Sequence, residues 1–462
     1  SGAGHLPVRI PARRRGRPPQ GATRNRPDRL PIGGVVSEAL ALGYSGGGDS
    51  TALLHALCAC HPDQTVHALI VDHQLRPESA EEAADNADYA RSLGAEPHIL
   101  RWTAPRKSQA AARQARHTLL AGACEGLGVS LLCLGHTLDD RVETLRMRAK
   151  REGAWRTLTG MTALDASPVW PEGRGVTVAR PFLELRRAQL RDYLKRLDAR
   201  WIEDPSNEDA QYERVQLRQK AYPPGGPAEH GLLTLSDQSV DAERLLRGAA
   251  WRLVERAVSW TAWGGARLNA DMFSLAAKPM ALRAMEAVML AVSGEARTPA
   301  PDGVAACLKA LEAQEAHTQA GVLLTADGVM GRDPGAVLGR ADGGAEPVML
   351  ELQAGETGLF DGRFEVRAEA ACQVAALGDR AAPEGVSLSD VPPALRQSLT
   401  VISCFSDSEV VELPGLALSE TDNWSLLCMT RLRRWLLPCE APTWFDGDKY
   451  ASHIRAALAK PV

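Results

Sequence analysis

Three successive glycines, Gly46-Gly47-Gly48, constrain the fold of this chain more than any other feature. The apolar residues 40–44 predict a short buried strand, and apolar side chains return at helical spacing after Ser50. A strand that turns through glycines into a helix N-terminus favours anion binding, because backbone N–H groups can approach a phosphate and the helix end carries partial positive charge. A glycine turn without a ligand is the alternative. The residues expected to bind the phosphates are Ser45, Gly46, Gly47, Gly48, Asp49 and Ser50.

The segment from about 35 to 180 alternates strand-like and helix-like stretches. The expected strands are 40–44, 66–71, 98–102, 131–135 and 176–180, and the expected helices are 51–60, 80–93, 108–126 and 139–151. Strands separated by helices form βαβ units, so we predict an α/β fold with a parallel sheet of about five strands and helices on both faces. Ligands bind such sheets at the carboxyl ends of the strands.

The 462-residue length suggests two or three domains, and Pro-Pro-Gly-Gly-Pro at 223–227 is the clearest boundary. We expect a catalytic domain at 31–222, a helical domain at 228–340 and a small β-rich domain at 345–462. Hairpin turns at Asp327-Gly328 and Asp361-Gly362 and a terminal helix near 450–458 belong to this interpretation.

Residues 1–30 contain eight arginines, five prolines and one acid, which predicts a disordered basic arm. A contact with RNA phosphates, a targeting leader and a cloning or start-site artefact remain alternatives for this arm. No apolar run is long enough to span a membrane. Nine scattered cysteines without a Cys-x-x-Cys pair favour free thiols in a reducing compartment, and hence a cytoplasmic protein.

A second functional stretch runs from Gly135 to Thr144. His136, Asp140 and Glu143 are spaced i, i+4 and i+7, so they are expected on one face at the start of a helix. An imidazole and two acids there suit a site that binds an ammonium group and removes its proton. A capped helix with acids at its positive end is the alternative, and Asp139 is the better candidate for the cap.

Other polar residues fall at the same predicted edge of the sheet or close to it. Asp72 and His73 end the second strand, where a carboxylate could hold the ribose or adenine edge of a nucleotide. Arg113 and Arg116 are spaced i, i+3 on a helix, where they would face phosphate or solvent. A basic stripe that could contact a phosphate backbone, or lie solvated, comprises Arg187, Arg191, Lys195, Arg214 and Arg218.

These motifs together resemble one family, the tRNA(Ile)-lysidine synthetases, whose catalytic domain is a PP-loop ATP pyrophosphatase of the adenine nucleotide alpha hydrolase-like type. The matching segments are Ser45–Ser50, Val71–Ser79, Ala112–His117, Gly135–Thr144, Gly160-Met161, Arg180–Leu183 and Trp201–Asn207. They occur in the family's order across residues 40–218. In the C-terminal half only Asp361–Phe364 resembles the family.

The resemblance implies a carbon–nitrogen ligase that modifies tRNA. The enzyme adenylates the C2 carbonyl oxygen of the wobble cytidine in tRNA(Ile) with a CAU anticodon, and the ε-amine of L-lysine then expels AMP to give lysidine. The implied cofactors are ATP and Mg²⁺. Asp49 would hold the metal ion, Arg116 would neutralise the reacting phosphorus, and Asp140 and Glu143 would bind lysine, with Asp140 or His136 accepting its proton.

The resemblance leaves some features open. Arg141 stands where the family commonly has Gln, His117 replaces the usual Tyr, and Arg151–Ala154 replaces the usual Arg-Gly-Ser-Gly. A tRNA thiolase with the same loop, or a non-catalytic tRNA-binding paralogue, is the alternative function. The helical domain would contact the tRNA and the β-rich domain would read its identity, while the oligomeric state stays open, with a homodimer as one option.

Overall fold

The computed structural model describes residues 39–105, 108–150, 155–203, 224–339, 346–405, 409–416, 424–440, 442–443 and 445–460. The basic arm, the segment Arg151–Ala154, Asp204–Asn207 and the arginines Arg214 and Arg218 lie outside these residues. The chain forms two compact units. The first holds the described residues up to Asp241 together with those from Cys439 onward, and the second holds Ala242–Pro438.

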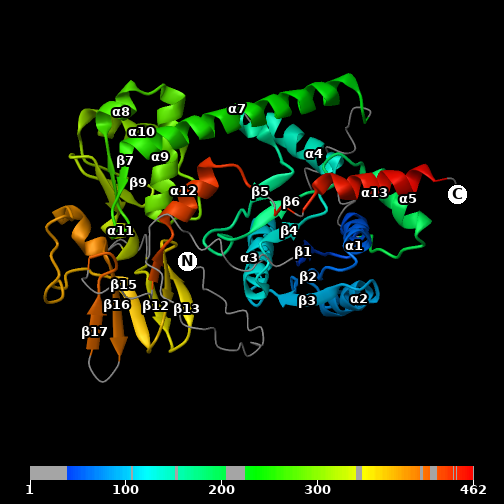
Figure 1. Ribbon diagram of the computed structural model, residues 1–462, viewed down its shortest axis with the longest axis horizontal. Helices are drawn as coiled ribbons and strands as arrows, with labels where there is room; N and C mark the ends of the chain where they lie inside the picture. Colours follow the sequence, from blue (N-terminus) through cyan, green and yellow to red (C-terminus); the bar gives the residue numbers. More distant parts are fainter. Residues whose placement is uncertain are drawn as a thin grey trace. The chain divides into compact units, whose positions relative to one another are not determined.

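The first unit is built on a six-stranded sheet of order β3-β2-β1-β4-β6-β5 (Figure 1). All neighbouring strands are parallel except β5, which pairs antiparallel with β6. The strands are β1 (Leu40–Gly43), β2 (Val66–Asp72), β3 (Glu96–Arg101), β4 (Leu131–Cys133), β5 (Leu164–Ala166) and β6 (Thr177–Ala179). The expected α/β fold with five parallel strands is therefore confirmed, and a sixth, antiparallel strand is added at one edge.

Helices cover both faces of this sheet. They are α1 (Gly48–Cys60), α2 (Ser79–Ser92), α3 (Gln109–Leu127), α4 (Leu138–Ala149) and α5 (Arg187–Arg196). One face buries Leu40, Leu42 and Ile70 against helix residues such as Leu53, and the opposite face buries Leu69 against α3 residues such as Leu120. Such alternation along a strand follows from the two-residue period of its side chains.

The position of β1 determines where a ligand can bind. Strand β1 has β2 on one side and β4 on the other, so the chain changes direction across the sheet at β1. A crevice forms at the carboxyl ends of the strands at such a switch point, between the loops that follow β1 and β4. The glycine loop follows β1, and His136 follows β4.

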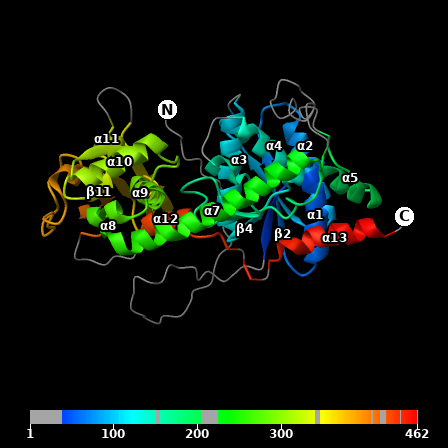
Figure 2. The ribbon, with the colours of Figure 1, turned by 90° about the horizontal axis from the view of Figure 1, so that it is seen from above.

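The last helix, α13 (Gly447–Ala459), packs on the first unit beside α1, as Figure 2 shows. Tyr450 and Ile454 are fully buried in the same core as Leu53. The Tyr450 hydroxyl lies 2.6 Å from Nε2 of His61. The C-terminal residues therefore belong with the first unit, which differs from the expected β-rich domain at 345–462, because the apolar face of α13 completes this core.

The second unit combines helices with three sheets. Its helices are the end of α7 (Pro227–Ala257), α8 (Ala270–Leu275), α9 (Lys278–Ser293), α10 (Pro301–Ala313), α11 (Pro334–Val337) and α12 (Cys428–Leu436). A five-stranded sheet has the order β7-β8-β11-β10-β9, formed by β7 (Val258–Trp260), β8 (Ala266–Leu268), β9 (His317–Gln319), β10 (Val322–Leu324) and β11 (Val329–Arg332). Its helical and β-rich parts form one unit because α12 packs on α9, so they are not divided between domains at 340–345.

The two remaining sheets of the second unit are small. One comprises β12 (Met349–Leu352), β15 (Cys372–Ala376), β16 (Thr400–Phe405) and β17 (Glu409–Glu412), and the other β13 (Thr357–Phe360), β14 (Phe364–Arg367) and β18 (Trp424–Leu426). The hairpin predicted at Asp361-Gly362 is confirmed, with φ of 49° and 62° at these two residues. Among the described helices, none combines the length and apolar character needed to cross a bilayer.

Candidate functional site

The glycine loop joins β1 directly to α1. Gly46 has φ of +76°, and a Cβ atom there would lie 2.3 Å from Oδ1 of Asn86, so glycine is required on both conformational and steric grounds. Ser50 donates a hydrogen bond to the carbonyl oxygen of Gly47 at 2.9 Å, and its Oγ lies 3.1 Å from that of Ser45. The loop therefore leads directly into a helix N-terminus, where anions bind, and Gly47 and Gly48 are partly exposed.

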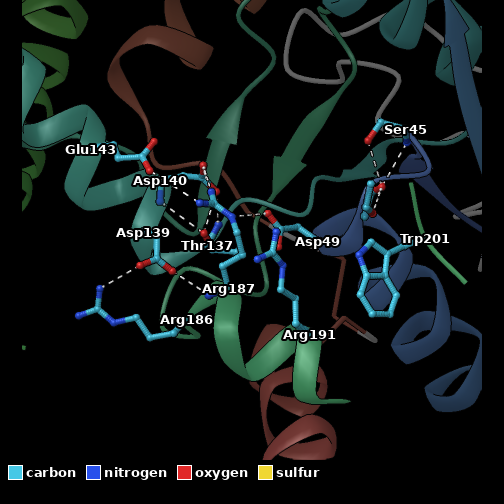
Figure 3. Close-up of polar contacts among 12 residues, drawn as sticks. Ser45, Asp49, Thr137, Asp139, Asp140, Glu143, Arg186, Arg187, Arg191 and Trp201 are labelled. Atoms are coloured by element: carbon cyan, nitrogen blue, oxygen red, sulfur yellow. Dashed lines mark hydrogen bonds and ion pairs between the residues drawn. The ribbon is translucent and has the colours of Figure 1, made fainter. Parts of the chain in front are cut away.

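Two other segments approach this loop closely. A Cβ atom on Gly135, which follows β4, would lie 2.9 Å from the backbone oxygen of Asp49. On the other side, the backbone N–H of Ile202 donates to the carbonyl of Gly46 at 2.9 Å, and Trp201 packs against Gly48. Figure 3 shows Trp201 and Asp49 in this arrangement. The motifs at 45–50, 135–144 and 201–203 thus meet in space.

Three carboxylates converge on one guanidinium beside the loop (Figure 3). Arg187 donates from Nε to Asp49 at 3.1 Å and from Nη2 to Asp140 at 2.9 Å, and its Nη1 lies 3.7 Å from Oε1 of Glu143. Although burial lowers the pKa of Arg187, Asp140 and Asp49 raise it above its usual value. The arrangement is an anionic site that accepts a cation.

Helix α4 positions two of these acids. Its N-cap is Thr137, whose side chain accepts from the backbone N–H of Asp140, while Asp140 accepts from the backbone N–H and hydroxyl of Thr137, both at 2.8 Å. The prediction that Asp139 caps this helix is therefore wrong. Asp139 instead accepts from the backbone N–H of Arg187 at 2.7 Å and pairs with Arg186, because it points toward the start of α5 rather than back along its own helix.

The pKa values of the two loop-facing aspartates differ in direction. Burial raises the pKa of the Asp49 carboxyl, and the nearby Arg187 only partly opposes this. For Asp140 burial also acts upward, but Arg187 and the hydrogen bonds from Thr137 outweigh it and lower the pKa below its usual value. Asp140 is therefore the more firmly ionised of the pair and the stronger partner for a cation.

His136 lies before α4 rather than on it, so its side chain is placed by the loop after β4. Burial lowers its pKa to about 3, and the nearby Arg180 acts in the same direction. Its Nδ1 is buried and has no hydrogen-bond partner among the described residues. His136 is therefore neutral at pH 7 and has a nitrogen available to a substrate.

A pocket of about 170 Å³ opens next to His136. It is lined by His73, Ala112, Arg113, Arg116, His117 and His136. Burial and the neighbouring Arg113 lower the pKa of Arg116, which is half-buried, whereas Arg113 is exposed. The structure therefore brings Arg113, Arg116 and His73 together with His136 around one cationic cavity.

Asp72 is buried at the end of β2. Its Oδ1 accepts from the Ser79 hydroxyl at 2.8 Å and from the Gln74 backbone at 3.0 Å. Its Oδ2 is buried without a hydrogen-bond partner among the described residues. One oxygen is thus fixed by the following turn, and the other keeps an unused capacity to accept a hydrogen bond.

The basic stripe does not act as one surface. Arg187 points into the carboxylates, whereas Arg191 pairs with Glu203 at 3.0 Å and Lys195 pairs with Asp192 at 3.8 Å on the exposed side of α5. Sequence reasoning missed the place of Arg187 in the site. The available signal was its position shortly after the last parallel strand, at the edge of the sheet where the other functional residues lie.

Arg141 has a structural partner. It pairs with Asp237 of α7, and its Nη2 lies 3.5 Å from the Ser236 hydroxyl. Arg186 likewise pairs with Glu229 of the same helix. Both pairs lie within the first unit, so they fix the start of α7 against α4 and α5.

Comparison with known proteins places these motifs in one family. Residues 27–224 match the family model described as the PP-loop domain. A tRNA(Ile)-lysidine synthase of Caulobacter vibrioides is 37% identical over 377 residues, which cover 79% of this chain and 83% of that protein. The tRNA(Ile)-lysidine synthases of Hyphomonas neptunium and Ruegeria pomeroyi are 39% and 38% identical, with 49% of this chain matched in each case and 60% and 52% of the relatives covered. The order of the strands, the glycine loop and these relatives together establish that the chain belongs to the tRNA(Ile)-lysidine synthase family.

Proposed function

We propose that this protein ligates L-lysine to C2 of the wobble cytidine in tRNA(Ile) with a CAU anticodon, using ATP and releasing AMP and pyrophosphate. The product, lysidine, pairs with A rather than G, and the tRNA then accepts isoleucine rather than methionine. One observation carries the proposal within this family. An anionic site for an amine, formed by Asp140 and Glu143, lies directly beside the glycine loop that carries Asp49.

The first step requires an activated carbonyl oxygen, because the C2 oxygen of cytosine is a poor leaving group until it carries a phosphoryl group. The backbone of Gly46–Gly48 and the N-terminus of α1 would hold the departing pyrophosphate. Asp49 fits a Mg²⁺ ligand, since it offers a hard carboxylate oxygen at the loop. When bound, Mg²⁺ supplies positive charge against the pyrophosphate.

The cationic pocket beside His136 suits the α-phosphate and the nucleoside part of ATP. Arg116, with Arg113 at its mouth, would neutralise charge at the α-phosphorus as the cytidine oxygen attacks. The free Oδ2 of buried Asp72 and the ring of His73 would contact the nucleoside part of ATP. With these roles, adenylation would occur between the glycine loop and α3.

The second step requires a neutral amine. Asp140 and Glu143 would bind the lysine ammonium, while the Arg187 guanidinium holds these two carboxylates in position. The proton then passes to His136, whose Nδ1 is available, or to Asp140, which is ionised. The neutral ε-amine attacks C2 and AMP leaves.

The tRNA would lie along the exposed basic residues of the first unit, Arg191 and Lys195 on α5 and Arg113 on α3. We also assign a tRNA-contacting role to the second unit, supported by family membership alone. Deleting residues 345–462 would test this poorly, because it also removes Tyr450 and Ile454 from the first core. Reversing the charge of exposed Arg252 and Arg256 on α7 is the sharper test, with weaker tRNA binding expected.

The reaction itself is tested with purified protein, ATP and unmodified CAU-anticodon tRNA(Ile), with and without lysine. Lysine incorporation into the tRNA together with AMP formation is the expected result, and Asp140→Ala should abolish incorporation. AMP without incorporation would mean that another nucleophile, such as a sulfur donor, is used. Binding of tRNA without any AMP would contradict an enzymatic role.

A further inference from the structure

A cluster of two histidines and a glutamate lies on the first unit, away from the glycine loop. His67 is the second residue of β2, and Glu96 and His98 are the first and third residues of β3. In the parallel register His67 is opposite Glu96. Because alternate residues of a strand share a face, all three side chains lie on the same side of the sheet. It is the side that α3 covers, since Leu69 follows His67 on it.

The cluster lies at the amino ends of the strands, whereas the functional residues lie at the carboxyl ends. Asp72 lies five positions after His67 along β2, which corresponds to roughly 16 Å at about 3.3 Å per residue. An inference about this cluster therefore does not depend on the proposed tRNA reaction.

The distances within the cluster match a shared cation. Nδ1 of His67 lies 3.1 Å from Nε2 of His98 and 3.5 Å from Oε2 of Glu96. All three donor atoms lie within 4.8 Å of one another. Two ligand atoms bound to one zinc ion at about 2.0–2.1 Å in tetrahedral geometry are roughly 3.4 Å apart. The side chains therefore need little adjustment to bind one ion.

A hydrogen-bonded histidine pair satisfies these atoms less well. Between two neutral imidazoles, one N–H can donate to the facing nitrogen, and this uses the single proton between them. If His98 donates, the Glu96 oxygen faces the lone pair of His67 Nδ1, and if His67 donates, its single proton faces two acceptors. A cation at the centre attracts all three atoms at once.

The chemical types of the three side chains agree with metal binding. Two imidazole nitrogens and one carboxylate oxygen form a donor set that favours zinc among the divalent cations of cells. Glu96 is exposed, which leaves a path for the ion and a fourth position for water.

We propose that His67, Glu96 and His98 form a zinc site that fastens β3 to β2. Among the described strands, β3 is at the edge of the sheet and pairs with β2 alone. An ion held by both strands would therefore stabilise the edge of the sheet, where β3 has a neighbouring strand on one side. The site would respond to zinc without taking part in the reaction at the opposite edge.

The test uses the full chain, freed of metal by chelation and titrated with Zn²⁺ against a chromophoric chelator. The Glu96→Gln and His98→Gln variants should each bind one zinc ion fewer than the wild type, or bind that ion roughly tenfold more weakly. A loss of at least this size is expected, because changes even to residues around a metal site weaken binding by that factor. His230→Gln, an exposed histidine on α7, is the matched control and should bind as the wild type does. Co²⁺ should give the intense visible bands of a four-coordinate site in the wild type and the control only.

Thermal melting gives a second measurement in case a variant binds zinc elsewhere. Zinc should raise the melting temperature of the wild type and of His230→Gln, but not of Glu96→Gln, which retains the size of the side chain. The proposal is overturned if the wild type binds no more zinc than Glu96→Gln, or if zinc stabilises both proteins equally. Lysine incorporation should be the same in wild type and Glu96→Gln.

Discussion

Arg187 donates a hydrogen bond from Nη2 to Oδ1 of Asp140 at 2.9 Å, so the acid proposed to bind the substrate amine already holds a cation. The same guanidinium reaches Asp49 on the glycine loop at 3.1 Å. One side chain thus connects the phosphate-binding and amine-binding parts of the site. Its removal would take away the guanidinium that these three carboxylates share.

Replacing Arg187 by Gln should impair lysine use more than folding. Truncating one partner of a buried charge pair costs about 2–5 kcal/mol, and the lower end applies to this partly exposed group. We therefore expect the KM for lysine to rise roughly 30-fold, which corresponds to about 2 kcal/mol. Arg187→Lys should retain part of the activity. A lower KM in Arg187→Gln would instead mean that the guanidinium competes with lysine.

Replacing Asp140 by Asn separates the charge of this residue from its structural role. Asn can still accept from Thr137, so α4 keeps its N-terminal hydrogen bond, whereas Asp140→Ala would lose a capping interaction of about 1 kcal/mol. We expect Asp140→Asn to lose lysine incorporation by at least about a hundredfold, because the ammonium loses an ionic partner.

Pyrophosphate exchange with tRNA present provides the internal control for Asp140→Asn. This exchange reports adenylation without lysine and should persist in the variant. Glu143→Gln should behave in the same way, since both acids face the amine. Loss of exchange in both variants would place these acids in the first step and contradict their assignment to lysine.

The stability of the protein should depend on His117 at acid pH. Burial, with Arg113 and Arg116 nearby, lowers the pKa of His117 to about 3, whereas an unfolded histidine has a pKa of about 6.5. The unfolded chain therefore binds more protons between these values, and the free energy of unfolding falls as the pH falls from about 6.5 to 3. The loss amounts to a few kcal/mol at most.

Urea unfolding of His117→Gln at several pH values checks this expectation. The variant should lose less stability than the wild type between pH 7 and pH 4, because the residue that must be protonated on unfolding is gone. His230→Gln, at an exposed position, serves as control and should follow the wild type. Equal slopes in all three proteins would exclude a neutral buried His117.

Lys195 should contribute to tRNA binding as a phosphate contact. Its side chain is 67% exposed and its partner Asp192 is also exposed, so little desolvation opposes a phosphate. Lys195→Glu should weaken tRNA binding and reduce the slope of log K against log salt by about 0.7–0.9, the value for one lost contact. Arg91→Glu on α2 is the matched control. An unchanged slope would remove α5 from the tRNA path.

The fold of the first unit could be predicted because its hydrophobic pattern, its helix signals and its glycine turn all indicate the same α/β arrangement. Apolar runs such as 40–44 and 131–135 alternate with helices, and the glycine loop fixes the connection after the first strand. The convergence of three carboxylates on one site could be predicted from the sequence only in part. Asp140 and Glu143 were expected together from their spacing, but their contact with Asp49 depends on the strand order, which single-sequence patterns do not contain.

Two features were beyond sequence reasoning for physical reasons. Arg187 was assigned to a basic stripe facing a phosphate backbone or solvent, because its helical spacing with Arg191 and Lys195 is the same whether or not one member points inward. The return of α13 to the first core depends on contacts between residues far apart in the chain, such as His61 and Tyr450. Neither periodicity nor turn signals report such contacts.

The final prediction concerns this returning helix. Ile454 of α13 is fully buried in the core that supports α1 and hence the glycine loop. Ile454→Ala should lower the free energy of unfolding by about 2–4 kcal/mol, because it removes buried methyl groups and leaves a cavity. Exposed Ser452→Ala on the same helix is the control and should change stability by less than about 0.5 kcal/mol. If α13 were a dispensable extension, both variants would unfold at the same denaturant concentration as the wild type. A selective loss in Ile454→Ala, accompanied by weaker ATP binding, would show that the end of the chain supports the loop formed near its beginning.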